Sequence, residues 1–361
     1  MNKSVYLINA LSVILVFSFI LSAFLAIDGG AVSLLLVPAA AYSDKAYPDI
    51  FGFGNVSEAM PGNTAQSNAT QGGTETPNND ASNTADTLGG SVSTAVDEVV
   101  MGNIVKKTLS PYTANLKCGR VCINNQSGAD IDIETELSKE LEFTASKGEE
   151  PQILIYHTHT TEGYMLTEED YYTDSDEPRT TDDAKNVVAV GEKIAEQLRT
   201  AGYSVIHDTT VHDYPGFTGS YTRSAETVKS VLSKYPSVKI AIDVHRDSIS
   251  QGKSDKVAPV VTVNGREAAQ VMLVMGSETG SITDYPYWRQ NLRFAMKLQY
   301  LFETDYPQFA RSLLLKSTKY NQNLTTGSIL IEMGSEANTL EQALYSGELV
   351  GKTLVTLLNS G

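Results

Sequence analysis

Histidine is rare in this chain, and the places where it occurs suggest a site for metal or acid–base chemistry. The five histidines are His157, His159, His207, His212 and His245. Three of them, His157, His159 and His245, come just after the apolar cores of two segments, ILIY and IAIDV. Imidazole nitrogens bind zinc and titrate near neutral pH. We therefore take these three histidines as candidate functional residues.

A glutamate within a third apolar segment adds a carboxylate to this set. Glu332 lies inside ILIEMG, and an unpaired charge buried among apolar side chains is very costly. Two histidines from different strands, with one or two carboxylates, suit a zinc site that keeps one position open for water. The only cysteines, Cys118 and Cys122, are too few for a thiolate site, and we expect no catalytic role for them.

Each of these residues also has an ordinary structural explanation. The Thr-His-Thr segment could bind loop backbone, and Glu332 could form an ion pair with Arg246. We expect His207 and His212, which lie in the polar segment HDTTVHD, to be solvated or to act only through other residues. A zinc hydrolase is favoured because histidines and a glutamate occur together at the ends of separate predicted strands. No single one of these residues would indicate that function.

The elements that must position these residues follow from the hydrophobic pattern. We expect strands at 152–157, 203–207, 238–247, 258–263, 269–278 and 328–336, and helices at 183–201, 224–235, 288–303, 305–315 and 339–359. Strands alternating with helices predict an α/β fold, with a mostly parallel sheet covered by helices. In such a sheet the carboxyl ends of parallel strands share one rim, where ligands bind.

The region before this pattern has a different character. Residues 5–27 form an apolar segment without charges that is long enough for a membrane anchor. A cleaved signal peptide is the alternative. An Asn-, Thr-, Ser- and Gly-rich stretch follows, which predicts a flexible tether. We therefore divide the chain into a cytoplasmic stub with an anchor (1–41), a low-complexity linker (42–98) and a catalytic domain (99–361).

The charge of the chain excludes one class of partner. It has 27 basic and 43 acidic side chains among 361 residues, a formal net charge of -16. Binding to nucleic acid depends on clustered Lys and Arg, and no basic stripe is present. We expect no nucleic-acid partner.

Several motifs in register resemble one family of proteins. The segments ILIYHTHTTEGY, KYPSVKIAIDVHRDS, PYWRQNL, KYNQNL and GSILIEMGSEANTLEQA resemble the stage II sporulation protein P family of spore-forming bacteria. The resemblance implies a zinc-dependent N-acetylmuramoyl-L-alanine amidase that also cuts stem-peptide crosslinks of peptidoglycan during engulfment. It also implies a Rossmann-like α/β fold similar to that of zinc cell-wall amidases.

The resemblance further implies roles for individual residues. His245 matches the second metal-binding histidine, and Glu332 matches the catalytic glutamate. The first histidine is His159 or His157, of which His159 matches the amidase position better. The carboxylate ligand is either Asp182, four residues before a helix asparagine, or Glu162. Arg246 would bind a substrate carboxylate or an oxyanion, or would form a structural ion pair.

The same resemblance implies a location and partners. The chain would be a single-pass protein of the cell membrane, anchored through its N-terminal helix, with the catalytic domain outside the cytoplasm and facing the engulfment space. Its partners would be peptidoglycan and the stage II sporulation proteins D and M.

Overall fold

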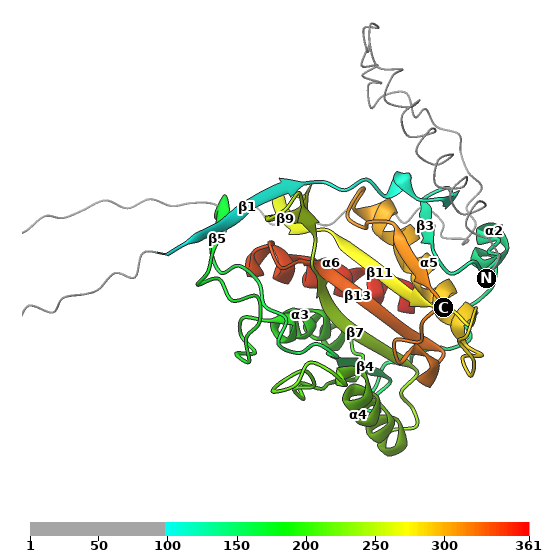
Figure 1. The fold of residues 1–361 in the computed structure, drawn as a ribbon. Helices are drawn as coiled ribbons and strands as arrows, with labels where there is room; N and C mark the ends of the chain where they lie inside the picture. Colours follow the sequence, from blue (N-terminus) through cyan, green and yellow to red (C-terminus); the bar gives the residue numbers. More distant parts are fainter. Residues whose placement is uncertain (1–97, 361) are drawn as a thin grey trace, which may run out of the picture. The chain divides into compact units, whose positions relative to one another are not determined.

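The computed structural model describes residues 98–360, and its largest element is an eight-stranded sheet. The sheet lies at the centre of the fold (Figure 1). In spatial order its strands are β2 (Leu116–Cys118), β3 (Val121–Asn125), β12 (Leu313–Lys316), β11 (Val271–Gly276), β13 (Gly327–Ser335), β7 (Ile240–Asp247), β4 (Ile153–Tyr156) and β6 (Val205–His207).

The sheet consists of two parallel blocks that run in opposite directions. Strands β13, β7, β4 and β6 are parallel to one another, and so are β3, β12 and β11. The blocks meet where β11 pairs antiparallel with β13, and β2 is antiparallel to β3. The α/β class is thus confirmed, and five of the seven strand pairs in this sheet are parallel, as predicted; the reversal between the two blocks was not predicted.

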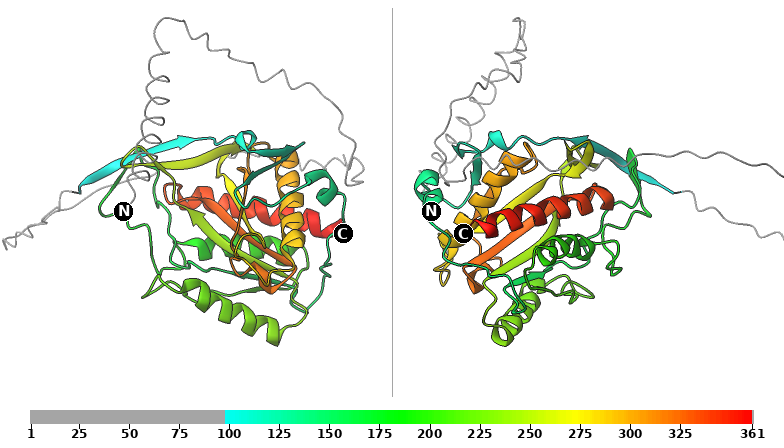
Figure 2. Two further views of the ribbon diagram at one scale, coloured as in Figure 1. Left: turned by 45° about the vertical axis from the view of Figure 1, so that its right-hand side comes forward. Right: turned by 180° about the vertical axis from the view of Figure 1, so that it is seen from behind.

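Helices cover the two faces of the sheet unequally. Alternate side chains of a strand point to opposite faces, so Ile153 and Ile155 join one core whereas Leu154 and Tyr156 join another. The first, larger core lies under α3 (Val187–Thr200), α5 (Trp288–Asp305) and α6 (Leu340–Asn359), which share one side of the sheet (Figure 2). The second, small core lies under α4 (Ser220–Lys234).

Residues Asp243, His245 and Glu332 project from the face that α4 covers only in part. In β7, Asp243 and His245 alternate with Ile242 and Val244, and in β13 Glu332 follows Ile331. The three apolar residues belong to the larger core, so the polar ones point to the other face. This face is therefore the place where polar groups of the central strands can reach a ligand.

A second, smaller sheet lies beside the first, and the sequence did not predict it. Its strand order is β10 (Arg266–Ala269), β9 (Asp255–Val263), β1 (Val100–Lys107) and β5 (Tyr171–Thr173), with β8 (Ser250–Gln251) paired to β9. Strands β1 and β9 are parallel although about 150 residues separate them along the chain. The remaining short elements are helix α2 (Ile133–Leu137) and two 3-10 turns, η2 (Pro111–Thr113) and η3 (Gln322–Leu324).

One predicted helix is wrong. The segment 305–315 lies after α5, which ends at Asp305, and its last residues begin strand β12. Leu313 and Leu315 are fully buried and alternate with the less buried Leu314, as expected of a strand between β3 and β11. Three consecutive leucines fit a helix or a strand equally well, and Pro307 prevents α5 from continuing.

The predicted anchor at 1–41 and most of the linker at 42–98 lie outside the described residues. Between residues 98 and 360 no helix has the length and apolar character needed to cross a membrane.

A buried ion pair joins α2 to α5 and predicts a pH dependence of stability. Glu136 is 4% exposed and accepts from Arg293 Nη2 at 2.9 Å and from Lys139 Nζ at 2.8 Å. Burial alone would raise the pKa of Glu136, but these two partners outweigh it and lower the pKa below its usual 4.5. A carboxyl whose pKa is lower in the folded state stabilises the fold above its unfolded pKa.

We predict that Glu136→Gln lowers the free energy of unfolding by about 2 kcal/mol at pH 7. The difference from wild type should shrink as the pH falls below about 4.5 and through the lowered pKa, because the wild-type carboxyl then takes up a proton. Urea unfolding across pH measures this effect. Glu134→Gln, an exposed neighbour on α2, is the control; a pH-independent difference for Glu136→Gln would contradict the prediction.

Candidate functional site

The three strands that carry the candidate residues lie side by side. Strand β7 lies between β4 and β13 and is parallel to both, so the three carboxyl ends share one edge. His245 and Glu332 are direct neighbours in the register of β7 and β13. His159 lies in the turn that directly follows β4. The rim that the sequence predicts is therefore present.

His159 lies among aromatic rings at this rim. Its ring stacks on Phe217 with centroids 4.4 Å apart, and it meets the His245 ring edge-on at 5.3 Å. Tyr221, at the beginning of α4, lies 5.7 Å from His159 and 6.4 Å from His245. The Nδ1 atom of His159 is buried without a hydrogen-bond partner, 4.0 Å from Asp213 Oδ2. This nitrogen is free to take a ligand.

Glu162 and Asp243 lie on either side of the His245 ring. Glu162 Oε2 is 3.5 Å from His245 Nδ1 and accepts a hydrogen bond from Arg246 N at 3.0 Å. On the other side, His245 Nε2 is 2.9 Å from Asp243 Oδ1, but it is not aligned for a hydrogen bond. Two carboxylates thus face the two nitrogens of one histidine.

Glu332 completes a cluster of four side chains with His159, Glu162 and His245. Its Oε2 atom is buried and has no hydrogen-bond partner. Burial raises the pKa of Glu332 to about 8, against the opposing effect of His245. A carboxyl with this pKa can hold a proton near neutral pH and release it.

The two histidines of the cluster differ in charge. Burial and the neighbouring His245 together lower the pKa of His159 to about 4, so His159 is neutral at pH 7. Burial also opposes protonation of His245, but Asp243, Glu162 and Glu332 outweigh it and raise the pKa to about 10. The carboxyl groups around His245 thus favour a positive charge at this ring.

His157 and Asp182, the alternatives for two metal-binding positions, lie away from this cluster. His157 is fully buried; its Nδ1 donates to Val244 O at 3.0 Å, and its Nε2 is 2.9 Å from His207 Nε2. Burial lowers the pKa of His157 to about 3. The Asp182 side chain is 45% exposed and pairs with Lys185 at 2.9 Å. The structure brings His159 and Glu162 to His245, and it does not bring their alternatives.

Arg246 holds backbone in place. Its side chain is 4% exposed, and it donates from Nε to Gly163 O at 3.0 Å and from Nη2 to Pro178 O at 2.5 Å. These bonds fix the loop that carries Glu162. Of the roles considered for Arg246, the contacts favour a structural one.

The remaining two histidines are more enclosed than we expected. His212 is 1% exposed and its Nδ1 donates to His157 O at 2.7 Å. The His207 side chain is 5% exposed and lies between His157 and Glu192. Of the two alternatives, the solvated one is wrong, because the loop HDTTVHD is hydrogen-bonded to the HTHTT turn. The other alternative, that both histidines act only through other residues, stays a prediction.

Sequence reasoning missed Asp243, which is fully buried within β7. Its Oδ1 accepts from Thr158 N at 2.8 Å and its Oδ2 from Thr158 Oγ1 at 2.6 Å. Thr158 lies between His157 and His159, so Asp243 connects the HTHTT turn to β7. The signal was present, because a carboxylate inside IAIDV is as costly as the one in ILIEMG. No sequence signal indicated Tyr221 or Phe217.

The donor types of the cluster are those that zinc prefers. Within residues 98–360, no three His, Cys, Asp or Glu side chains stand together as a group that could hold a metal ion. One pair is suitably spaced, because the 3.5 Å between Glu162 Oε2 and His245 Nδ1 is close to the roughly 3.4 Å expected of two donors on one tetrahedral zinc. His159 Nδ1, buried without a hydrogen-bond partner, is a further nitrogen donor at this rim.

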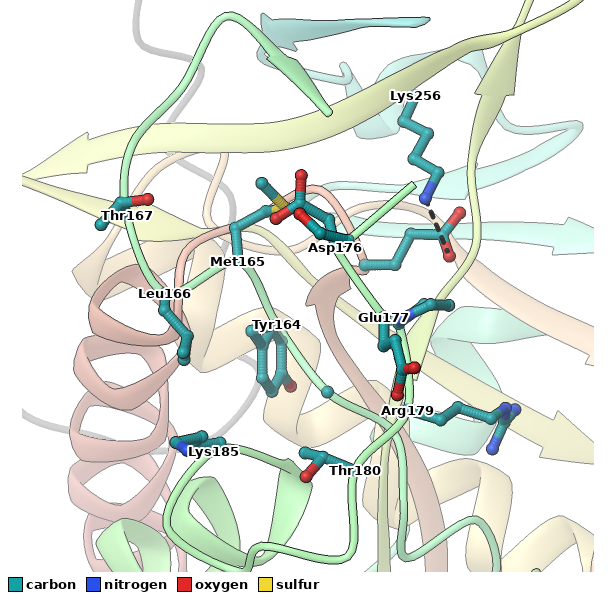
Figure 3. Close-up of a pocket in the computed structure, with 14 residues that line it drawn as sticks. Tyr164, Met165, Leu166, Thr167, Asp176, Glu177, Arg179, Thr180, Lys185 and Lys256 are labelled. Atoms are coloured by element: carbon teal, nitrogen blue, oxygen red, sulfur yellow. Dashed lines mark ion pairs between the residues drawn. The ribbon is translucent and has the colours of Figure 1, made fainter. Parts of the chain in front are cut away.

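A pocket of about 430 Å³ lies next to Glu162, and Gly163, the following residue, lines it (Figure 3). It lies between the segments 163–167 and 175–180, with Lys185, Lys256 and Glu336 at its edges. Arg179 connects it to the cluster, because its Nη2 is 3.6 Å from Glu162 Oε1 and its Nη1 donates to Asp213 at 2.6 Å.

We predict that Asp243→Ala destabilises the fold by about 3–5 kcal/mol, because the Thr158 N–H, the Thr158 hydroxyl and the protonated His245 lose a buried partner. Urea unfolding at pH 7 measures the loss. Asp182→Ala, which removes an exposed carboxylate, should leave the unfolding midpoint unchanged. Equal midpoints for the two variants would contradict the account of Asp243.

Comparison with known proteins identifies the family. Residues 59–354 match the family described as stage II sporulation protein P (SpoIIP). The chain is 30% identical over 208 residues to the stage II sporulation protein P of Bacillus subtilis (strain 168). That match covers 54% of this chain and 48% of the relative, so it spans about half of the relative's length.

Solved structures that are similar include two amidases. The CwlD amidase of Clostridioides difficile, solved in complex with the GerS lipoprotein, is 13% identical with a TM-score of 0.33, covering 57% of this chain and 94% of that one. The N-acetylmuramyl-L-alanine amidase Ami1 of Mycobacterium abscessus is 13% identical with a TM-score of 0.34, covering 58% and 99%. TM-scores this low do not establish a shared fold. The family match covers most of the sequence, and the chain belongs to the stage II sporulation protein P family.

Proposed function

We propose that the chain is a zinc-dependent peptidoglycan hydrolase that cleaves the amide between N-acetylmuramic acid and L-alanine. The observation that carries this proposal is that two side chains next to His245 have buried atoms without a hydrogen-bond partner, His159 Nδ1 and Glu332 Oε2. Glu162 neighbours the same histidine. Membership of the stage II sporulation protein P family supports it. The same site would also cleave crosslinks between stem peptides, since both reactions hydrolyse an amide.

His159, Glu162 and His245 would hold the zinc ion. Their donors are the nitrogen and oxygen atoms that zinc prefers, and three protein ligands leave a fourth position open. His157 Nδ1 is occupied by Val244 O, and the Asp182 carboxylate is paired at the surface, so neither competes for this role.

When bound, zinc supplies a Lewis acid that polarises the scissile carbonyl and lowers the pKa of water. Glu332 would then accept a proton from the attacking water and deliver it to the leaving amine nitrogen. Asp243 would hold the ring of His245 from the side opposite Glu162, because carboxylates behind a metal-binding histidine fix its orientation. Phe217 and Tyr221 would exclude water from His159.

We also propose the location and partners that the family resemblance implies. An anchor within residues 1–41 would hold the chain in the cell membrane, with the catalytic domain outside the cytoplasm in the engulfment space. The stage II sporulation proteins D and M would act with it on peptidoglycan. The net charge of -16 does not favour electrostatic attraction to anionic wall polymers, so attachment would depend on the anchor and these partners.

We predict that the full chain releases stem peptides from purified peptidoglycan and that Glu332→Gln lowers the rate by about 10²–10⁴-fold, because the proton acceptor is lost. Glu341→Gln, on the exposed side of α6, is the matched control and should retain wild-type activity. Mass spectrometry of the products identifies the bond, since only an amidase frees the peptide from muramic acid.

Three outcomes of this digestion would change the proposal. Release of crosslink-cleaved fragments alone would indicate an endopeptidase. Binding to the wall without any soluble fragment would indicate a non-catalytic scaffold. Full activity of Glu332→Gln would remove Glu332 from the mechanism.

We predict that Glu162→Gln lowers the affinity for zinc by at least tenfold whereas Asp182→Asn does not change it, because only Glu162 lies at His245. Competition with a chromophoric chelator measures the affinity, and His245→Ala should abolish binding. The reverse order of effects would assign the carboxylate ligand to Asp182.

A further inference from the structure

The pocket next to Glu162 is lined by charged side chains of both signs (Figure 3). Its charged lining residues are the cations Arg179, Lys185 and Lys256 and the anions Asp176, Glu177 and Glu336. The pocket is thus close to neutral, whereas the whole chain carries a charge of -16. An acidic ligand that most of the protein repels can approach here.

Two of the cations form only weak ion pairs with the protein. Lys185 pairs with Asp182 at 2.9 Å, but both side chains are nearly half exposed, and such surface pairs contribute little. Lys256 Nζ is 3.7 Å from Glu336 Oε2, beyond hydrogen-bond distance, and 3.9 Å from the centroid of the Tyr172 ring, and only 17% of its side chain is exposed. A carboxylate entering the pocket can gain a charge-assisted hydrogen bond from either ammonium without breaking a strong one.

The pocket also has the position that a substrate extending from the cluster would need. Gly163, at its wall, follows Glu162 directly, and Arg179 contacts Glu162 while lining the pocket. Beside these charges the wall contains the apolar side chains of Met165 and Leu166. Pockets of about 300–1,000 Å³ are large enough for a small organic ligand. A short peptide with carboxylates and small apolar side chains fits both the size and the lining.

We propose that this pocket binds the carboxylate-bearing peptide portion of the substrate, through Lys185 and Lys256, while the scissile amide lies at the cluster. The proposal rests on the proposed function and extends it by assigning the side on which the leaving peptide lies. The pocket thereby selects peptides with free carboxylates over peptides in which these groups are amidated.

Peptide binding to the full chain tests this assignment without requiring hydrolysis. Isothermal titration calorimetry would compare a synthetic stem tetrapeptide that has free carboxylates with the same peptide amidated at those groups. We expect the free acid to bind at least tenfold more tightly, and Lys185→Gln and Lys256→Gln each to weaken its binding about tenfold. Neither variant should change the affinity for the amidated peptide.

Lys193→Gln is the matched control. The side chain of Lys193 is 41% exposed and that of Lys185 is 48% exposed, and each pairs with an acidic residue three positions away. Lys193 does not line the pocket. Lys185→Glu provides a second test at a surface position, independent of whether Lys256→Gln folds, and should weaken binding of the free acid further. Equal affinities for both peptides, or wild-type binding by both lysine variants, would overturn the assignment.

Digestion of a soluble muramoyl peptide separates this inference from the proposed function. If the wild-type chain hydrolyses it and both lysine variants keep the wild-type KM, the pocket assignment falls and the function stands. If the chain binds the peptide in the expected pattern but hydrolyses nothing, the function falls and the pocket assignment stands.

Discussion

The arrangement of the site depends on one buried carboxylate, Asp243. It accepts two hydrogen bonds from Thr158, in the turn after β4, and lies 2.9 Å from His245 in its own strand. A charge buried this deeply is tolerated only with such partners, so the two strands and the histidines they carry are held in one geometry. Asp243 thus links the turn that carries His159 to the strand that carries His245.

The unequal covering of the sheet explains why a polar cluster can exist inside an apolar fold. Helices α3, α5 and α6 bury one face almost continuously, and that core supplies the stabilisation from apolar burial. Among residues 98–360, α4 covers a small apolar cluster on the opposite face. Asp243, His245 and Glu332 project from this second face, where aromatic side chains such as Tyr221 close the site without filling it.

The sequence predicted the strands that carry the candidate residues better than it predicted how the sheet is paired. Apolar runs ending in His or Glu identified β4, β7 and β13, because a buried polar group is costly and therefore informative. The reversal between β11 and β13 and the pairing of β1 with β9 depend on contacts distant in sequence, which local periodicity does not encode. For the same reason the sequence did not decide whether Glu162 or Asp182 is the carboxylate ligand, because it is the folding of a loop that brings Glu162 to His245.

The proposed function requires nitrogen and oxygen donors of this rim to hold a catalytic zinc ion. X-ray absorption at the zinc edge, on the full chain loaded with one equivalent of zinc, identifies these donors. We expect two imidazole nitrogens with oxygen donors at roughly 2.0–2.2 Å, and loss of one imidazole in His159→Ala. Sulfur donors at about 2.3 Å from Cys118 or Cys122, or failure to retain zinc, would contradict it.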